Sequence, residues 1–108
     1  MAKKVLGQSN PSATTATTLY TVPASKEAVI SSISVANLDA ADAVYDIAIR
    51  PAGASLANLH YLAKNVTVGA SDSTIITVGL TLATTDVVTV NASTANLAFH
   101  AYGDEASV

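Results

Sequence analysis

The stretch DSTIITVGLTLATTDVVTVNA, residues 72–92, indicates how the rest of the chain folds. In both halves apolar residues alternate with small or polar ones, which is the two-residue period of a half-buried β-strand. The short polar segment ATTD, residues 83–86, joins the two halves. Two β-branched runs with such a connection predict an antiparallel β-hairpin. The apolar positions that share one face are Ile76, Val78, Leu80, Leu82, Val88, Val90 and Ala92.

Similar alternation occurs on both sides of this stretch, in segments separated by Pro, Gly, Asn and Asp. About seven or eight short strands, with turn signals roughly every ten residues, predict an all-β chain that forms a single antiparallel β-sandwich. The pattern does not distinguish a jelly roll from an immunoglobulin-like Greek key. The further strands are expected at residues 19–22, 27–37, 43–50, 59–68 and 97–102.

One face of each strand is expected to form the core. In residues 27–37 the alternation places Val29 and Ile33 inward and Ile30 outward. Gly103 is expected to end the last strand and to leave a short acidic tail. The expected core residues are Val29, Ile33, Val35, Tyr45, Ile47, Ile49, Ile76, Val78, Leu80, Leu82, Val88, Val90, Leu97 and Phe99.

A chain of 108 residues has the length of one domain. Residues 1–18, MAKKVLGQSNPSATTATT, contain too few apolar side chains to order themselves and predict a flexible N-terminal arm. Residues 19–108 are then the β-sandwich domain. The arm is either a disordered tail or a segment that docks on a neighbouring subunit. Its candidate interface residues are Lys3, Lys4, Val5 and Leu6.

The charge balance bears on possible partners. A net charge of −3, with Lys3–Lys4 as the one basic pair, argues against a nucleic-acid partner. No apolar run reaches the roughly 18 residues of a membrane span, and the N-terminus lacks the apolar region of a signal peptide, so we expect neither membrane insertion nor export. Only 12% of residues are charged, which favours a homo-oligomer.

No catalytic or metal-binding pattern is found in the sequence. His60 and His100 lie on strand faces opposite the apolar residues and are expected at the surface or in an interface. The aspartates, among them Asp46, fall in turns or on outward faces, and no base is placed to activate a Ser or Thr. We therefore expect a protein that is not an enzyme and needs no cofactor or metal. Tyr20, Tyr45, Tyr61 and Tyr102 would form a sugar-binding platform if they clustered.

Three segments carry a resemblance to a known group of proteins: LYTVPAS (residues 19–25), IAIRPAGAS (47–55) and LTLATTDVVTVNASTANLAFHAYG (80–103). With them the chain resembles small structural proteins of tailed bacteriophages, especially phages of cyanobacteria and other marine bacteria. The resemblance implies a β-sandwich component of the virion, assembled in the host cytoplasm, and carries no catalytic residues. It implies a capsid decoration (cement) subunit or an accessory part of the tail. The partners would be the major capsid protein or other virion proteins, with a homotrimer favoured.

Two hypotheses therefore remain. The chain is a capsid decoration protein that stabilises the shell across the seams between capsomers, or it is a tail or fibre accessory module that binds a host glycan. Copy number distinguishes them, because a decoration protein is present in hundreds of copies per virion and a tail part in tens or fewer.

Overall fold

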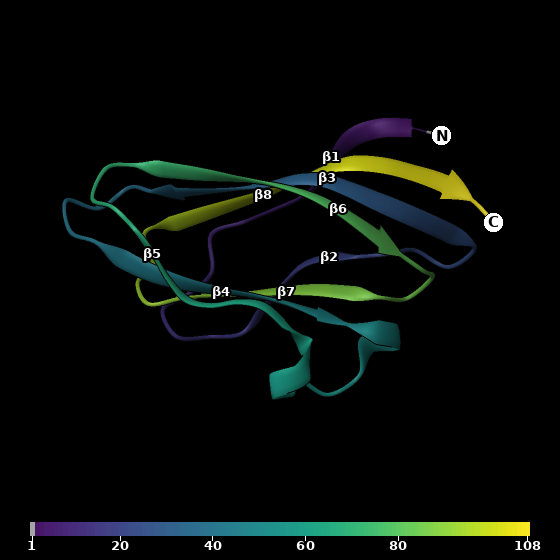
Figure 1. Cartoon of the computed structure of the whole chain (residues 1–108), viewed down its shortest axis with the longest axis horizontal. Coiled ribbons are helices and arrows are strands. Elements are labelled where there is room, and N and C mark those ends of the chain that lie inside the picture. The colour runs from purple at the N-terminus through teal and green to yellow at the C-terminus, as the bar shows by residue number, and fades with distance from the viewer. Residues whose placement is uncertain (1) are drawn as a thin grey trace.

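A computed structural model of the chain describes residues 2–108 and confirms the all-β sandwich. Two four-stranded antiparallel sheets pack face to face (Figure 1). No helix in residues 2–108 is long and apolar enough to cross a membrane. The strands are β1 (Ala2–Ser9), β2 (Thr17–Thr21), β3 (Lys26–Asn37), β4 (Ala43–Arg50), β5 (Tyr61–Val68), β6 (Ser73–Leu82), β7 (Val87–Ala92) and β8 (Leu97–Ser107), and the short 3-10 helices η1 (Pro51–Gly53) and η2 (Asn58–His60) lie between β4 and β5.

The strand order identifies the sandwich as a jelly roll. One sheet has the order β1-β8-β3-β6 and the other the order β2-β7-β4-β5. The pairs β1–β8, β2–β7, β3–β6 and β4–β5 are nested around the connection between β4 and β5, as in a long hairpin rolled up on itself. This eight-stranded arrangement in two sheets is the jelly roll, and it resolves the alternative that the sequence left open.

The predicted hairpin of residues 72–92 is wrong, although both of its strands exist. β6 pairs with β3 in one sheet, whereas β7 pairs with β2 and β4 in the other. Residues 83–86 therefore cross from one sheet to the other. The Asp86 carboxylate accepts hydrogen bonds from the backbone N–H groups of Ala83 and Ala52, both at 2.9 Å, and so fixes this crossing. The local pattern gives the two strands, but their partners are set by segments far away in the sequence.

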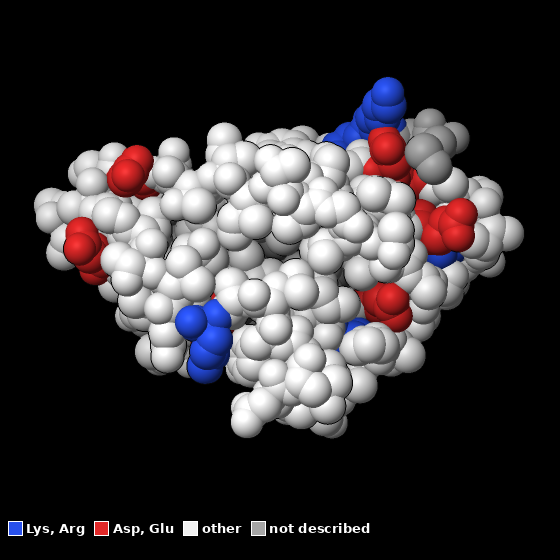
Figure 2. Space-filling view, in the orientation of Figure 1, with Lys and Arg blue, Asp and Glu red and all other residues white. Residues whose placement is uncertain are grey.

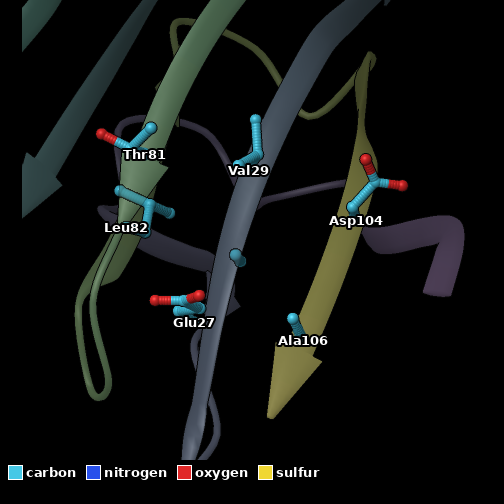
Figure 3. Close-up of a pocket in the computed structure, with 7 residues that line it drawn as sticks. Glu27, Val29, Thr81, Leu82, Asp104 and Ala106 are labelled. Atoms are coloured by element: carbon cyan, nitrogen blue, oxygen red, sulfur yellow. The ribbon is translucent and has the colours of Figure 1, made fainter. Parts of the chain in front are cut away.

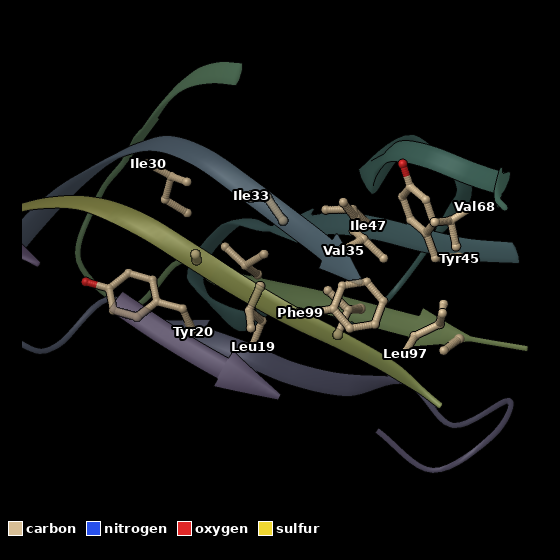
Figure 4. Packing of buried hydrophobic residues seen from close by; sticks show 14 of the residues in the cluster. Leu19, Tyr20, Ile30, Ile33, Val35, Tyr45, Ile47, Val68, Leu97 and Phe99 are labelled. Atoms are coloured by element: carbon tan, nitrogen blue, oxygen red, sulfur yellow. The ribbon is translucent and has the colours of Figure 1, made fainter. Parts of the chain in front are cut away.

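The core lies between the two sheets, as Figure 4 shows for a cluster that includes Phe99, Tyr45 and Ile33. Nine of the expected core residues are fully buried, and Ile49, Ile76, Val78 and Leu80 are partly buried against them. The buried nine are Ile33, Val35, Tyr45, Ile47, Leu82, Val88, Val90, Leu97 and Phe99.

The expected orientation of Val29 and Ile30 is wrong. Ile30 is fully buried and Val29 only partly, because the register of β3 with both of its neighbours shifts between Ile30 and Ser32. Ser31 is exposed in this irregularity, and its hydroxyl donates to the Tyr102 carbonyl at 3.1 Å. Such a β-bulge changes which side chains face inward, and alternation alone does not reveal it.

The prediction of a flexible arm over residues 1–18 is wrong for residues 2–9, while Met1 lies outside the described residues. Residues 2–9 form β1, which pairs antiparallel with β8. A Cβ atom on Gly7 would lie 2.1 Å from the Leu19 carbonyl oxygen, so glycine lets β1 approach the start of β2 closely. Main-chain pairing, and not apolar content, therefore orders this segment.

Gly103 does not end the last strand either, since β8 continues to Ser107. A Cβ atom at Gly103 would lie 1.9 Å from the Val29 carbonyl oxygen. The glycine is needed for the close approach of β8 to β3 and does not act as a turn residue. The expected acidic tail is therefore a paired part of the first sheet.

Candidate functional site

The predicted interface residues on β1 lie against the chain's own sandwich. The Lys4 ammonium is 2.8 Å from the Glu105 carboxylate, which also accepts a 2.5 Å hydrogen bond from the Tyr20 hydroxyl. The Lys4 ion pair, helped by the Tyr20 bond, lowers the pKa of Glu105, while burial and the nearby carboxylate raise the pKa of Tyr20. The three side chains link β1, β8 and β2, so Lys4 is engaged within its own fold.

The remaining candidates differ in how available they are. Leu6 packs against the core, whereas Lys3 is exposed and the Val5 side chain keeps 48% of its accessible surface. A shallow hollow of about 560 Å³ lies beside them, lined also by Ser31 and Tyr102. Of the four predicted residues, Lys3 and Val5 are therefore the ones that another molecule can reach most easily.

The prediction that both histidines lie at the surface is wrong for His60. Only 9% of His60 is exposed, and its Nδ1 accepts a hydrogen bond from the Ala57 N–H at 3.0 Å within η2. His100 is partly exposed on the outer face of β8, where its Nδ1 is 3.0 Å from the Gln8 amide nitrogen. Each imidazole thus has a local hydrogen-bonding partner.

The four tyrosines do not form one platform. Tyr20 and Tyr45 are buried in the core, and the Tyr61 ring lies 4.6 Å from the Lys64 ammonium. Tyr102 instead pairs with His100, with ring centroids 6.1 Å apart and ring planes within 3° of parallel. This pair on β8 is a two-ring aromatic group in which both residues are partly exposed.

Asp46 is more buried than its expected outward position suggests. Asp46 is only 8% exposed, accepts the Asn65 N–H at 2.7 Å, and forms an ion pair with Lys64 at 3.2 Å. This ion pair raises the pKa of Lys64. Asn65 has φ 53°, and the bond from its N–H to Asp46 fixes this left-handed position within β5. Asp46 therefore shapes an edge strand and is not a free surface carboxylate.

Other carboxylates have the turn roles that the sequence predicts. Asp42 accepts the Ala70 N–H at 3.0 Å, and Asp72 accepts the Ser73 N–H at 2.8 Å. Within residues 2–108, no group of three or more His, Asp or Glu side chains is placed to hold a metal ion.

Two carboxylates border a hollow of about 170 Å³ on the outer surface of the first sheet. Figure 3 shows Glu27 on β3 and Asp104 on the neighbouring strand β8, with the two carboxylates directed apart. Two carboxylates that share one reacting group must converge on it. This hollow therefore lacks the geometry of a carboxylate pair for acid–base chemistry.

One side of the sandwich is formed where β5 and β6 are the edges of the two sheets. On the opposite side the sheets are closed by β1 and β2, which meet at Gly7 and Leu19. Between β5 and β6 a cleft of about 250 Å³ opens onto the core, lined by Leu62, Ile76, Val78 and Leu80 among others. Figure 2 shows this side as mostly white surface, with acidic groups toward both ends of the molecule and one basic group below the centre.

Exposed apolar side chains are concentrated on the elements that border this cleft and on the loop and η2 before β5. Five of the eight large exposed hydrophobic residues of the described chain come from η2, β5, the loop before them and the start of β6. They include Leu59, which is 84% exposed, and Ile75, which is 69% exposed. The five are Leu56, Leu59, Leu62, Val66 and Ile75.

Sequence reasoning missed this surface, which we call the open side: β5, β6, η2 and the cleft between them. The signal was present, since Lys64 and Asp72 are the only charged residues between positions 51 and 83. Lys64 is already paired with Asp46. Exposed apolar side chains concentrated on a few neighbouring elements are a feature of interaction sites.

No protein-family model, curated protein or solved structure gives a significant match to the chain. What the protein does is therefore inferred from its surfaces.

Proposed function

We propose that this chain is a structural protein of a tailed-bacteriophage virion, a capsid decoration (cement) subunit that binds the major capsid protein across capsomer seams. The observation that carries the proposal is the open side, a mostly apolar surface with a cleft of about 250 Å³ between two sheet edges. A surface of this kind suits contact between copies of the subunit, which leaves β1, on the opposite side, to bind the shell. It offers little to an ionic substrate.

Two further features support this role. Jelly rolls are a recurrent architecture of viral capsid and lectin domains, although a fold by itself does not determine function. On β1, exposed Lys3 and Val5 combine a positive charge with an aliphatic side chain on a chain of net charge −3. That combination suits an acidic, partly apolar seam of a shell, whose subunits would be repeated in many copies and held by avidity.

The copy number of the chain in purified virions tests the proposal. Densitometry of virion proteins on a gel, calibrated against the major capsid protein, should give hundreds of copies of this chain per particle. Cross-linking followed by mass spectrometry should then join its lysines to the major capsid protein. Absence of the chain from virions would contradict the proposal, and a copy number in the tens with cross-links to tail proteins would favour the second candidate.

A tail or fibre module that binds a host glycan is the second candidate, and one observation favours it. The parallel rings of His100 and Tyr102 form a flat outward group beside the Gln8 amide. Sugars stack on such rings and use neighbouring amides as hydrogen-bonding partners. Binding to a glycan array that is lost in Tyr102→Ala and retained in Leu59→Ala, a variant of an exposed side chain on η2, would support this candidate.

A further inference from the structure

We propose that two copies of this chain pair through β6, edge to edge and antiparallel, around a two-fold axis perpendicular to the sheets. The sheet β1-β8-β3-β6 would then continue into the same sheet of the partner. β6 is an edge strand, so the backbone N–H and C=O groups on its outer side have no neighbouring strand. The inference concerns how the chain associates with itself and does not depend on the proposed virion role.

The other three sheet edges carry features that discourage strand pairing. β1 has two lysines and a register shift between Val5 and Gly7. β2 has only five residues and a register shift of its own. β5 has Lys64, the left-handed Asn65 and two register shifts against β4. Charged side chains, short length and bulges are the usual protection of an edge strand.

β6 lacks most of this protection. It has ten residues, STIITVGLTL, with no charged residue and no Pro. Its one irregularity is a bulge, where Val78 and Gly79 both lie opposite Ser31 of β3. The half from Ser73 to Thr77 pairs with β3 without interruption and is the regular part of the edge. An edge with no charge, whose first half is regular, is a template for a further strand.

The side chains of β6 favour the same contact. Ile76, Val78 and Leu80 face inward but remain only partly buried, because the cleft beside them is open. In an edge-to-edge pair centred on Ile76, which lies in the regular half of β6, the Ile76 side chains of the two copies would lie next to each other and the two clefts would face the interface. The exposed Leu62 at the rim of each cleft would then cover the partner's opening. Pairing would thus bury, in both copies, apolar side chains that the monomer leaves partly exposed.

The open side is large enough for a stable dimer. It is the side that faces the viewer in Figure 1, where the molecule measures 43 Å by 28 Å. A standard interface buries roughly 800 Å² on each partner, which is about two-thirds of that outline. Charge opposes the approach little, because the acidic residues lie toward the two ends of this side (Figure 2) and the ammonium of Lys64 is already paired with Asp46.

A second copy fits this edge better than an unrelated strand does. Two-fold contacts are self-complementary, so one unprotected edge on each copy is sufficient. The pairing also closes, because each copy presents β6 once and the other edges are protected. The alternatives, a strand from another protein or a three-fold assembly, give different masses and are outcomes of the test.

The test compares the wild type with a variant that places charge on the outer face of β6. Ile75→Lys with Thr77→Lys changes two exposed positions, so the monomer should still fold. Across the two-fold axis the added lysines face those of the partner, and like charges on paired strands repel. The matched control, Val5→Lys with Thr18→Lys, makes the same kind of change at exposed positions on β1 and β2 and gives the same net charge of −1 in place of −3.

Sedimentation equilibrium should give the wild type and the control a mass of twice the 10.9 kDa chain, and the β6 variant should raise the dimer Kd at least about tenfold. Circular dichroism must show that both variants keep the β fold. If the β6 variant does not fold, hydrogen exchange of the wild type decides, since β6 amides should gain protection as protein concentration rises. A monomeric wild type, a trimer, a dimer that the β6 variant leaves intact, or β6 amides whose exchange ignores concentration would each overturn the proposal.

Discussion

Tyr45 and Phe99 meet edge to face across the core, with ring centroids 6.2 Å apart and ring planes at 76°. Tyr45 comes from β4 in one sheet and Phe99 from β8 in the other, so the pair links the two layers at the centre of the sandwich. Phe99 is fully buried and is the largest of the completely buried side chains. This geometry is a favourable one for two aromatic rings.

Replacing Phe99 with Ala should therefore lower the free energy of unfolding by about 3–5 kcal/mol, a large part of the stability of a small domain. The removed ring leaves a cavity and deprives Tyr45 of its partner. Urea denaturation followed by circular dichroism measures the loss. Leu59→Ala serves as the control, because that side chain is 84% exposed and its loss should change stability by no more than about 0.5 kcal/mol. Equal midpoints for the two variants would show that Phe99 does not carry the core.

The strand positions could be predicted from the sequence because alternation is a local signal. β4 was expected at its observed bounds, and Ile33, Val35 and Phe99 were expected inward, as observed. Each of these assignments depends only on which neighbours are apolar.

What could not be predicted depends on contacts between distant segments. The alternation of residues 72–92 is the same whether β6 and β7 pair with each other or with strands of different sheets. The side-chain composition of β1 is typical of a flexible arm. Its order comes from main-chain pairing with β8, which composition does not reveal. The open side depends on the strand order, which makes β5 and β6 the edge strands of the two sheets. Only this order brings the exposed residues Leu62 and Ile75 to the same side of the molecule.

Three glycines in strands give a matched set of variants. Alanine at Gly7 or Gly103 would place a Cβ atom 2.1 Å or 1.9 Å from a backbone carbonyl oxygen, and backbone cannot move aside as a flexible side chain can. We expect each substitution to cost about 1–3 kcal/mol. Gly79→Ala is the control, because its Cβ would meet nothing within 4 Å and alanine is favoured over glycine in a strand by about 0.5–1 kcal/mol. Thermal melting should place the Gly7 and Gly103 variants below the wild type and the Gly79 variant at or above it.

The ion pair of Lys4 and Glu105 predicts a pH dependence of stability. In the folded state the pKa of Glu105 is lowered from its usual 4.5. The ionised carboxylate therefore stabilises the folded chain above pH 4.5, and this stabilisation is lost as the pH falls through the lowered, folded-state pKa. In Glu105→Gln this contribution is absent at every pH. The gap in urea midpoint between wild type and variant should therefore be constant from pH 7 to pH 5 and shrink as the pH falls towards 3. A gap that stays constant down to pH 3 would mean that the carboxylate is no better stabilised in the folded chain than in the unfolded one.

Removing residues 1–9 should destabilise the sandwich itself. The deletion takes away β1, leaves the backbone of β8 without a partner on one side, and removes the Lys4 ion pair from Glu105. It also uncovers the surface against which Leu6 packs, and burial of one such side chain is worth about 1.5–3 kcal/mol. We therefore expect a lower melting temperature and, because a regular edge is newly exposed, a greater tendency to aggregate. A truncated chain that melts like the wild type would show that β1 contributes nothing to the fold. Residues 1–9 would then be free to act on a partner, as a flexible arm would.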